Sequence, residues 1–178
     1  MALRKATAYS KHKKIAYTRK SSVKAKSYIK TIPQQKIVKF IMGDVAKFNQ
    51  GKLPWLVKLK SKEDVQIRDN ALESARMLIH HEIEKLKRDY YFAVSCYPHH
   101  VLRENKMLTG AGADRMQTGM SQSFGVPVNL AARVKAGETI FVVAVNNEKD
   151  AAIVHEILKK AKAKLPCKSS IVTEKYQQ

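Results

Sequence analysis

The chain has 178 residues, of which 44% are hydrophobic, so it can bury one real core but has little room for a second domain. No apolar run reaches the roughly 18 residues of a membrane span, and no signal-peptide block opens the chain, which predicts a cytoplasmic protein. The 34 Lys and Arg against 15 Asp and Glu give a formal net charge of +19, which favours a polyanionic partner, nucleic acid before an anionic membrane.

Residues 1–35 are predicted to be a basic arm. Twelve Lys or Arg precede the first acidic residue, Asp44, and no sustained apolar period would let the arm build a core. Tyrosines interleave with these cations, and tyrosine rings stack on bases, so we expect the arm to order on RNA. The alternative is a solubilising tail. The candidate RNA-binding residues are Arg4, Tyr9, Lys11, Lys13, Lys14, Tyr17, Arg19, Lys20, Lys24, Lys26 and Tyr28.

Two strands are predicted next, in the first part of a single domain that spans residues 36–178. The run Lys36–Met42 is rich in β-branched and aromatic residues and ends at Gly43. Leu56–Lys60 alternates apolar and basic residues, the pattern of a strand with one buried face.

A long amphipathic helix is predicted from Asp64 to Arg88, with Ser61 and Asp64 as start signals. The spacing places Leu78 in the core and Arg76 on a charged face, where it is either solvated or available to RNA. The expected apolar stripe comprises Ile67, Ala71, Ala75, Leu78, Glu82 or Ile83, and Leu86.

Three more strands follow in the prediction. Tyr90–Tyr97 ends at Pro98, and Val126–Val134 and Thr139–Val145 are separated by a short turn with Gly137, which predicts a hairpin. Because hairpins pair strands side by side, the sheet should be antiparallel or mixed.

A second helix begins at Asn147 and ends before Pro166, with lysines in its last turn where the helix dipole favours cations. Ile171–Thr173 offers a last short strand. The predicted fold class is therefore α+β, an antiparallel or mixed sheet with two helices packed on it.

A glycine-rich segment separates the strand at Tyr97 from the strand at Val126. Four of the seven glycines lie between Gly110 and Gly125, which predicts a long mobile loop over about residues 104–122. Cations lie in or beside this loop, so its partner should be an anion. They are Arg103, Lys106, Arg115 and Arg133.

Known nucleotide and metal motifs are missing from this segment and its surroundings. The glycines are not followed by Lys-Ser/Thr, and Arg115 replaces the third glycine of a dinucleotide fingerprint. Lys159 stands where a zincin helix has its second histidine, and His80 and His81 point about 100° apart on a helix. We expect neither metal nor cofactor.

The two cysteines, Cys96 and Cys167, are too few for a disulfide framework and are predicted to be buried thiols. Cys96 with His99 and His100 could form a thiolate–imidazole pair, but a cluster at a strand end is the simpler interpretation. One other enzymatic alternative is open. Gly112–Gly119 loosely resembles the aspartate loop of pseudouridine synthases, with Asp114 as the catalytic group, although Asp114 could instead hold Arg115 in place.

Several short segments taken together resemble one family, the universal large-subunit ribosomal protein called number sixteen in bacteria and ten-e in archaea and eukaryotes. The resemblance covers about residues 15–175, and the archaeal branch is most similar. The segments are Ile32-Pro33, Lys36-Ile37, Met42-Gly43, Ala71–Arg76, Pro98–Arg103, Asn105–Leu108 and Gly110–Met120.

The resemblance implies an α/β hammerhead-like fold, large-subunit rRNA binding that would include Arg76, Arg103 and Arg133, and a loop directed at the tRNA sites. It adds tRNA, neighbouring ribosomal proteins and subunit assembly factors as candidate partners. The loop residues expected near tRNA are Asn105, Lys106, Gly110, Gly112, Asp114, Arg115, Gln117, Thr118 and Gly119.

The sequence departs from the family pattern just after the loop. Ser121-Gln122 stand where Arg-Gly is expected, and Val126 stands where lysine is frequent, so two expected cations are missing. The alternatives to a ribosomal protein are a free-standing RNA-modifying enzyme that uses Asp114 and a basic DNA-binding protein.

Overall fold

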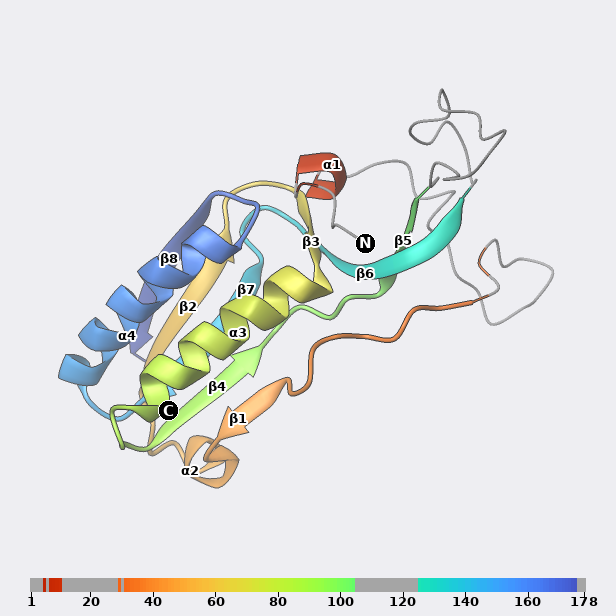
Figure 1. Cartoon of the computed structure of the whole chain (residues 1–178). Helices are drawn as coiled ribbons and strands as arrows, with labels where there is room; N and C mark the ends of the chain where they lie inside the picture. Colours follow the sequence, from red (N-terminus) through yellow and green to blue (C-terminus); the bar gives the residue numbers. More distant parts are fainter. Residues whose placement is uncertain (1–4, 6, 11–28, 30, 105–124, 176–178) are drawn as a thin grey trace, which may run out of the picture.

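The computed structural model describes residues 5, 7–10, 29, 31–104 and 125–175. Within them the strands form two antiparallel sheets (Figure 1), one of five strands in the order β1-β4-β7-β2-β8 and one of three in the order β3-β6-β5. The larger sheet contains β1 (Ile41–Gly43), β2 (Trp55–Ser61), β4 (Tyr90–Val94), β7 (Thr139–Val145) and β8 (Ser169–Lys175). The smaller contains β3 (Val65–Arg68), β5 (His100–Glu104) and β6 (Val126–Val134).

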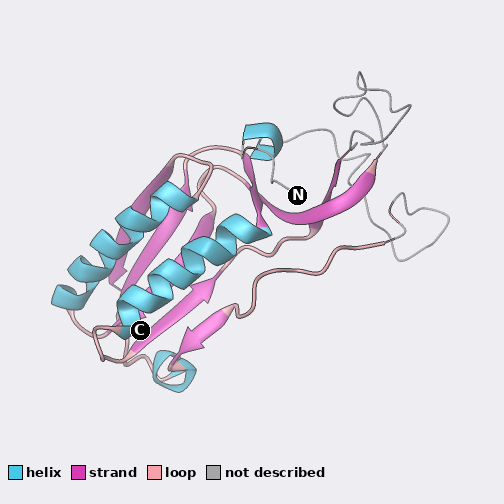
Figure 2. Ribbon diagram, viewed as in Figure 1, coloured by secondary structure: helices cyan, strands magenta, loops and turns pink. Residues whose placement is uncertain are grey.

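Two long helices, α3 (Asp69–Glu84) and α4 (Glu148–Ala161), lie side by side on one face of the five-stranded sheet (Figure 2). Two short helices complete the fold, α1 (Thr7–Ser10) and α2 (Val45–Asn49), and a 3-10 turn at Lys162–Lys164 follows α4. The predicted α+β class with two helices on an antiparallel sheet is confirmed.

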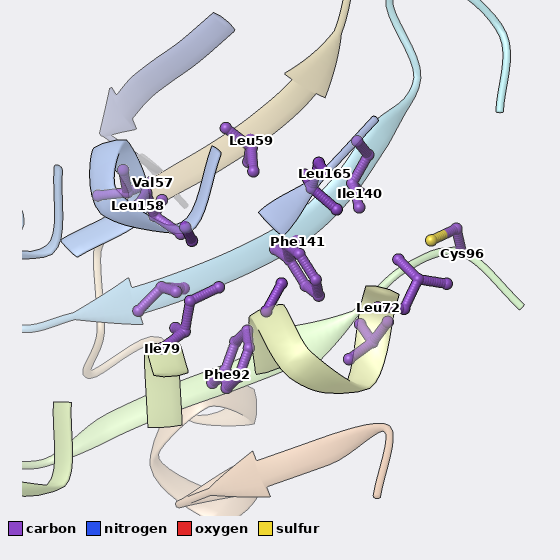
Figure 3. Packing of buried hydrophobic residues seen from close by; sticks show 14 of the residues in the cluster. Val57, Leu59, Leu72, Ile79, Phe92, Cys96, Ile140, Phe141, Leu158 and Leu165 are labelled. Atoms are coloured by element: carbon purple, nitrogen blue, oxygen red, sulfur yellow. The ribbon is translucent and has the colours of Figure 1, made fainter. Parts of the chain in front are cut away.

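The main core lies between these helices and the sheet. Phe92 of β4 and Phe141 of β7 are fully buried with their ring centroids 5.8 Å apart, and Leu72 and Ile79 of α3 lie on the same side of the sheet (Figure 3). The buried apolar residues of α4 recur at the spacing of a helix with one buried face, and they are Ala151, Val154, Ile157, Leu158 and Ala161.

The predicted start of the first long helix is wrong. Residues 65–68 form β3, and α3 begins only at Asp69. Ile67 therefore belongs to a strand, and counting helical turns from it shifts the apolar stripe by one residue. The fully buried apolar residues of α3 are Leu72, Ala75, Ile79 and Ile83, while Leu78 is only half-buried.

The predicted strand Lys36–Met42 is shorter than expected, since only Ile41–Gly43 pairs in the sheet. The residues before it run along α3 instead. The backbone N–H of Lys36 donates to the Asp69 carboxylate at 3.3 Å, and that of Val38 donates to Glu73 at 3.4 Å. Side chains of the helix thus satisfy donors that a sheet partner would otherwise take.

The predicted hairpin between residues 126 and 145 is also wrong. Both strands exist, but β6 belongs to the small sheet and β7 to the large one. The turn between them is hydrogen-bonded to Ser61, the last residue of β2. Gly137 N–H donates to Ser61 O at 2.8 Å, and Ser61 N–H donates to Glu138 O at 2.9 Å. This junction carries the chain from one sheet to the other.

The sequence analysis did not predict two short elements, α2 and β5. The helix α2 begins after Asp44, whose carboxylate accepts the Lys47 N–H at 3.0 Å as an N-cap. The strand β5 follows Pro98, where the sequence signals only a loop. The predicted strands at Leu56, Tyr90 and Ile171 are confirmed with shifted ends.

The two cysteines are free. Cys96 is buried, which raises the pKa of its thiol to about 12, and Cys167 is half-buried with a pKa raised for the same reason. The helices among the described residues include none that is long and apolar enough to span a membrane. The same part of the chain holds no group of three or more metal-ligating side chains that could bind an ion.

Gly43 should tolerate substitution far less well than Gly137. Both have positive φ, +88° and +84°, which costs an L-residue about 1–2 kcal/mol. A Cβ on Gly43 would lie 2.2 Å from the Tyr90 carbonyl oxygen, whereas nothing lies within 4 Å of one on Gly137. Urea unfolding of Gly43→Ala and Gly137→Ala measures the difference, and equal losses of stability would show that the β1 edge moves freely.

Candidate nucleic-acid interface

The small sheet has one apolar and one polar face. Its register pairs Arg68 with Ala131 and Ala131 with His100, and it pairs Gln66 with Arg133. Because side chains alternate along a strand, these residues share one face of the sheet. The residues between them, Val65, Ile67, Ala132 and Val134, are buried in the main core and hold the sheet to the rest of the protein.

Each strand of the small sheet carries one arginine, Arg68 on β3, Arg103 on β5 and Arg133 on β6. Arg68 and Arg133 lie on the polar face. Arg103 lies near the end of the sheet, where its Nη2 donates to the Gly125 carbonyl oxygen at 3.0 Å. We call the polar face with Arg68, His100, Arg133 and the adjoining Lys135 the basic face.

The N-terminal arm returns to this sheet at two places. The carbonyl oxygen of Tyr9 in α1 accepts a hydrogen bond from Gln66 Nε2 at 3.2 Å, and the Arg68 guanidinium lies 5.7 Å from the centre of the Tyr9 ring. Ile29 is buried in a separate apolar cluster with Val101 and Leu130. Tyr9 of α1 and Ile29 are therefore attached to the small sheet.

The glycine-rich segment begins and ends at the same sheet. It leaves after Glu104, the last residue of β5, and the described chain resumes at Gly125, directly before β6. The hydrogen bond from Arg103 to Gly125 joins the two sides at this point. The segment 105–124 itself, with all nine candidate tRNA-proximal residues, lies outside the described residues. So do the candidate arm residues other than Tyr9.

A hollow of about 760 Å³ opens beside the basic face, lined by His100, Arg133 and the turn Lys135–Glu138 together with Asp64. Its carboxylates are engaged with backbone N–H groups: Asp64 accepts from Ala136 at 2.8 Å and Glu138 accepts from Lys135 at 2.8 Å. Within the described chain no carboxylate forms an ion pair with the side chains of Arg133 or Lys135. These two cations remain available to an outside anion.

Several cations of the helical layer are paired with carboxylates. Lys85 lies 2.7 Å from Glu82, Lys159 lies 3.6 Å from Glu156, and Arg88 forms an ion pair with the buried Asp150. On the other side of the molecule, Lys58 and Lys60 share Glu174. Arg133 and Lys135 differ from these paired cations, because no carboxylate of the described chain forms an ion pair with either of them.

Arg76 is not on a solvated face, and that part of the prediction is wrong. Its side chain is buried, its Nη2 lies 2.6 Å from Glu73 Oε1, and its Nη1 lies 3.1 Å from Met42 Sδ. The Arg76 guanidinium holds the pKa of the Glu73 carboxyl below its ordinary value. This geometry fits a structural role between α3 and β1, so we leave Arg76 out of the proposed interface.

The basic face includes residues that the sequence analysis did not propose as RNA contacts, namely Arg68, His100 and Lys135. The alternation Val65-Gln66-Ile67-Arg68 is a strand signal, but the helical period that starts at Ile67 concealed it. The thiolate–imidazole interpretation of Cys96 loses support, because its thiol is buried with a high pKa and the His99 ring packs 4.4 Å from that of Tyr97.

Comparison with known proteins identifies one family. The family model of ribosomal protein L16p/L10e matches residues 12–172. The chain is 42% identical over 179 residues to the large ribosomal subunit protein uL16 of Methanococcus maripaludis strain C7, covering 99% of this chain and 97% of the relative. The protein of the same name from Hyperthermus butylicus is 46% identical over 149 residues, covering 82% and 79%. That from Sulfolobus acidocaldarius is 44% identical over 175 residues, covering 96% and 93%.

Proposed function

Because the chain belongs to the ribosomal protein L16p/L10e family, we propose that it binds large-subunit rRNA through the basic face and the arm, and supports tRNA positioning through residues 105–124. Its membership makes it a structural constituent of the large ribosomal subunit, found in ribosomes in the cytoplasm. The relatives carry the names of ribosomal proteins, not of enzymes, and the organisms are archaea, as the sequence indicated.

One observation carries the RNA-binding part of the proposal. The arm and the glycine-rich segment, which hold most of the candidate RNA-binding residues, are both attached to the sheet that bears the uncompensated Arg133 and Lys135. A surface that binds phosphate needs cations free of internal carboxylates. Sedimentation through a sucrose gradient tests whether the chain is bound in the large subunit. The tagged protein should sediment with the large subunit, and a peak of free protein or of protein bound to DNA would contradict the proposal.

Neutralising the basic face should reduce the salt dependence of rRNA binding. Each phosphate contact contributes roughly 0.7 to 0.9 to the slope of log affinity against log salt. We therefore expect the double variant Arg133→Gln/Lys135→Gln to bind large-subunit rRNA more weakly and with a shallower slope. Filter binding across a salt series gives the measurement.

The matched control is Lys85→Gln/Lys159→Gln, which removes the same charge from residues paired with Glu82 and Glu156. Its slope should stay close to that of the unchanged protein. If both double variants lowered the slope equally, net charge alone would explain binding and the basic face would have no special role.

The tRNA part of the proposal rests on residues 105–124. Arg115→Ala should leave subunit incorporation intact while slowing tRNA accommodation or late subunit maturation, because a guanidinium can bridge phosphates that alanine cannot. Gly112→Val should act similarly by restricting the backbone. Translation rate and subunit profile are the readouts. Normal elongation with Arg115→Ala, combined with loss of an RNA modification in Asp114→Ala, would favour the enzyme that uses Asp114.

A further inference from the structure

The strand β2 and the helix α4 begin at the end of the molecule away from the small sheet (Figure 1). A second hollow is lined by residues of these two elements and of β8. Its volume is about 400 Å³. The walls come from the first residue of β2, the first turns of α4 and the edge strand β8. They are Trp55, Glu148, Ala151, Ala152, His155, Glu156 and Thr173. The alanines leave the floor open, since larger side chains at 151 and 152 would fill it.

The aromatic wall already attracts a cation. The Nζ of Lys175 lies 5.6 Å from the centre of the Trp55 ring, and Trp55 pairs with Lys175 in the register of β2 and β8. An indole ring is the best aromatic partner for an ammonium or guanidinium group. The indole is half-buried and lines the hollow, so it can also contact a group that enters from outside.

The charged wall is acidic. Glu156 is shared with Lys159 at 3.6 Å and His155 at 3.7 Å, but no cation or N–H group of the described chain pairs with the Glu148 carboxylate. Glu148 is exposed in the first turn of α4 and lines the same hollow as Trp55. These carboxylates repel phosphate and attract a cation. The hollow therefore suits a different partner from the basic face.

We propose that this hollow receives an arginine side chain from a basic segment of a neighbouring protein, an inference that rests on the proposed place of the chain in the large subunit. The guanidinium would lie between Trp55 and the carboxylates of Glu148 and Glu156. A planar guanidinium can stack on an indole and bind a carboxylate through two N–H groups at once, which an ammonium cannot do. The site holds a protein at the end of the molecule that faces away from the basic face.

Trp55 makes the inference directly testable, because it is the only tryptophan in the chain. The full-length protein is titrated with a short peptide of alternating glycine and arginine, and Trp55 emission is recorded. Work at about 0.15 M salt limits repulsion between the two positive molecules, since the screening length is then about 8 Å. A saturable change in emission is expected, and the matching glycine–glutamine peptide should give none.

The variants Glu148→Gln and Glu156→Gln should each weaken peptide binding, and together by about tenfold or more, because each removes a charge-assisted hydrogen bond. Glu84→Gln is the control, since Glu84 is an exposed carboxylate on α3 outside the hollow. No emission change with the arginine peptide, or equal weakening by Glu84→Gln, would overturn the inference.

A single-stranded RNA oligonucleotide separates this proposal from RNA binding. If the RNA changed Trp55 emission saturably and the arginine peptide did not, the hollow would be an RNA site and the inference would be wrong. Affinity for large-subunit rRNA is measured on the same variants. If the unchanged protein did not bind large-subunit rRNA, the proposed function would be wrong. If rRNA affinity were normal in the unchanged protein and in Glu148→Gln/Glu156→Gln, but the arginine peptide did not change Trp55 emission, only the inference about the hollow would be wrong.

Discussion

Ile79→Ala should destabilise the protein by about 2–5 kcal/mol, the range for removing a buried branched side chain and leaving a cavity. Ile79 has no exposed surface and lies in the main core beside Phe92 of β4 (Figure 3). The core cluster that contains Ile79 includes residues of both the sheet and α4, so removing its side chain leaves a cavity that neighbouring residues fill only in part. Urea unfolding of the two proteins gives the difference in free energy.

Leu78→Ala is the matched control, because it removes a side chain of similar size one position away on the same helix. Leu78 is only half-buried and packs at the edge of the core, so its loss should cost clearly less than that of Ile79. A larger effect at Leu78 would mean that α3 turns Leu78 rather than Ile79 into the core, as the sequence predicted, and would contradict the described packing of α3.

Arg76→Ala should be the second severe change. Removing one partner of a buried ion pair costs about 3–5 kcal/mol, because the remaining charge is left without compensation. The side chains of Arg76 and Glu73 are 10% and 14% exposed, so we expect the lower end of that range. Thermal unfolding with calorimetry measures the loss, and the same helix provides the control.

Lys85→Ala breaks a pair with the same spacing, Lys85 with Glu82 at 2.7 Å, but Lys85 is 56% exposed and the cost should be about 0–1 kcal/mol. The cost of Arg76→Ala should also depend on pH. The pKa of Glu73 is lowered from 4.5 in the folded protein, so the ion pair stabilises the folded protein fully at pH values above 4.5. This stabilisation is lost as the pH falls through the lowered pKa of Glu73. Equal effects of the two variants at neutral pH would show that Arg76 is solvated.

The fold could be predicted where one periodic pattern covers a whole element. The stripe of α4 from Ala151 to Ala161 is regular and bounded by Asn147 and Pro166, and the structure confirms it. At α3 two patterns meet, because the strand Val65–Arg68 runs directly into the helix and Ile67 fits both periods. Local spacing cannot decide between them. The pairing of β3 with β6 settles the boundary, and that contact joins residues far apart in the sequence.

The hairpin prediction failed for a similar reason. Gly137 correctly marked a turn, but turn chemistry does not say whether the flanking strands pair with each other. Here Ser61 holds the turn and directs β6 and β7 into different sheets. Of the candidate site, the cations Arg103 and Arg133 could be found from composition near the glycines. Arg68 could not, because only the pairing of β3 with β6 brings its strand beside that of Arg133.

A density map of the large ribosomal subunit that contains this chain tests the central claim most directly. The account predicts that the basic face lies against rRNA, with the guanidinium of Arg133 and the ammonium of Lys135 within hydrogen-bonding reach of phosphate oxygens. A basic face turned toward solvent or covered by another protein, with rRNA contacting the helical layer of α3 and α4 instead, would contradict it.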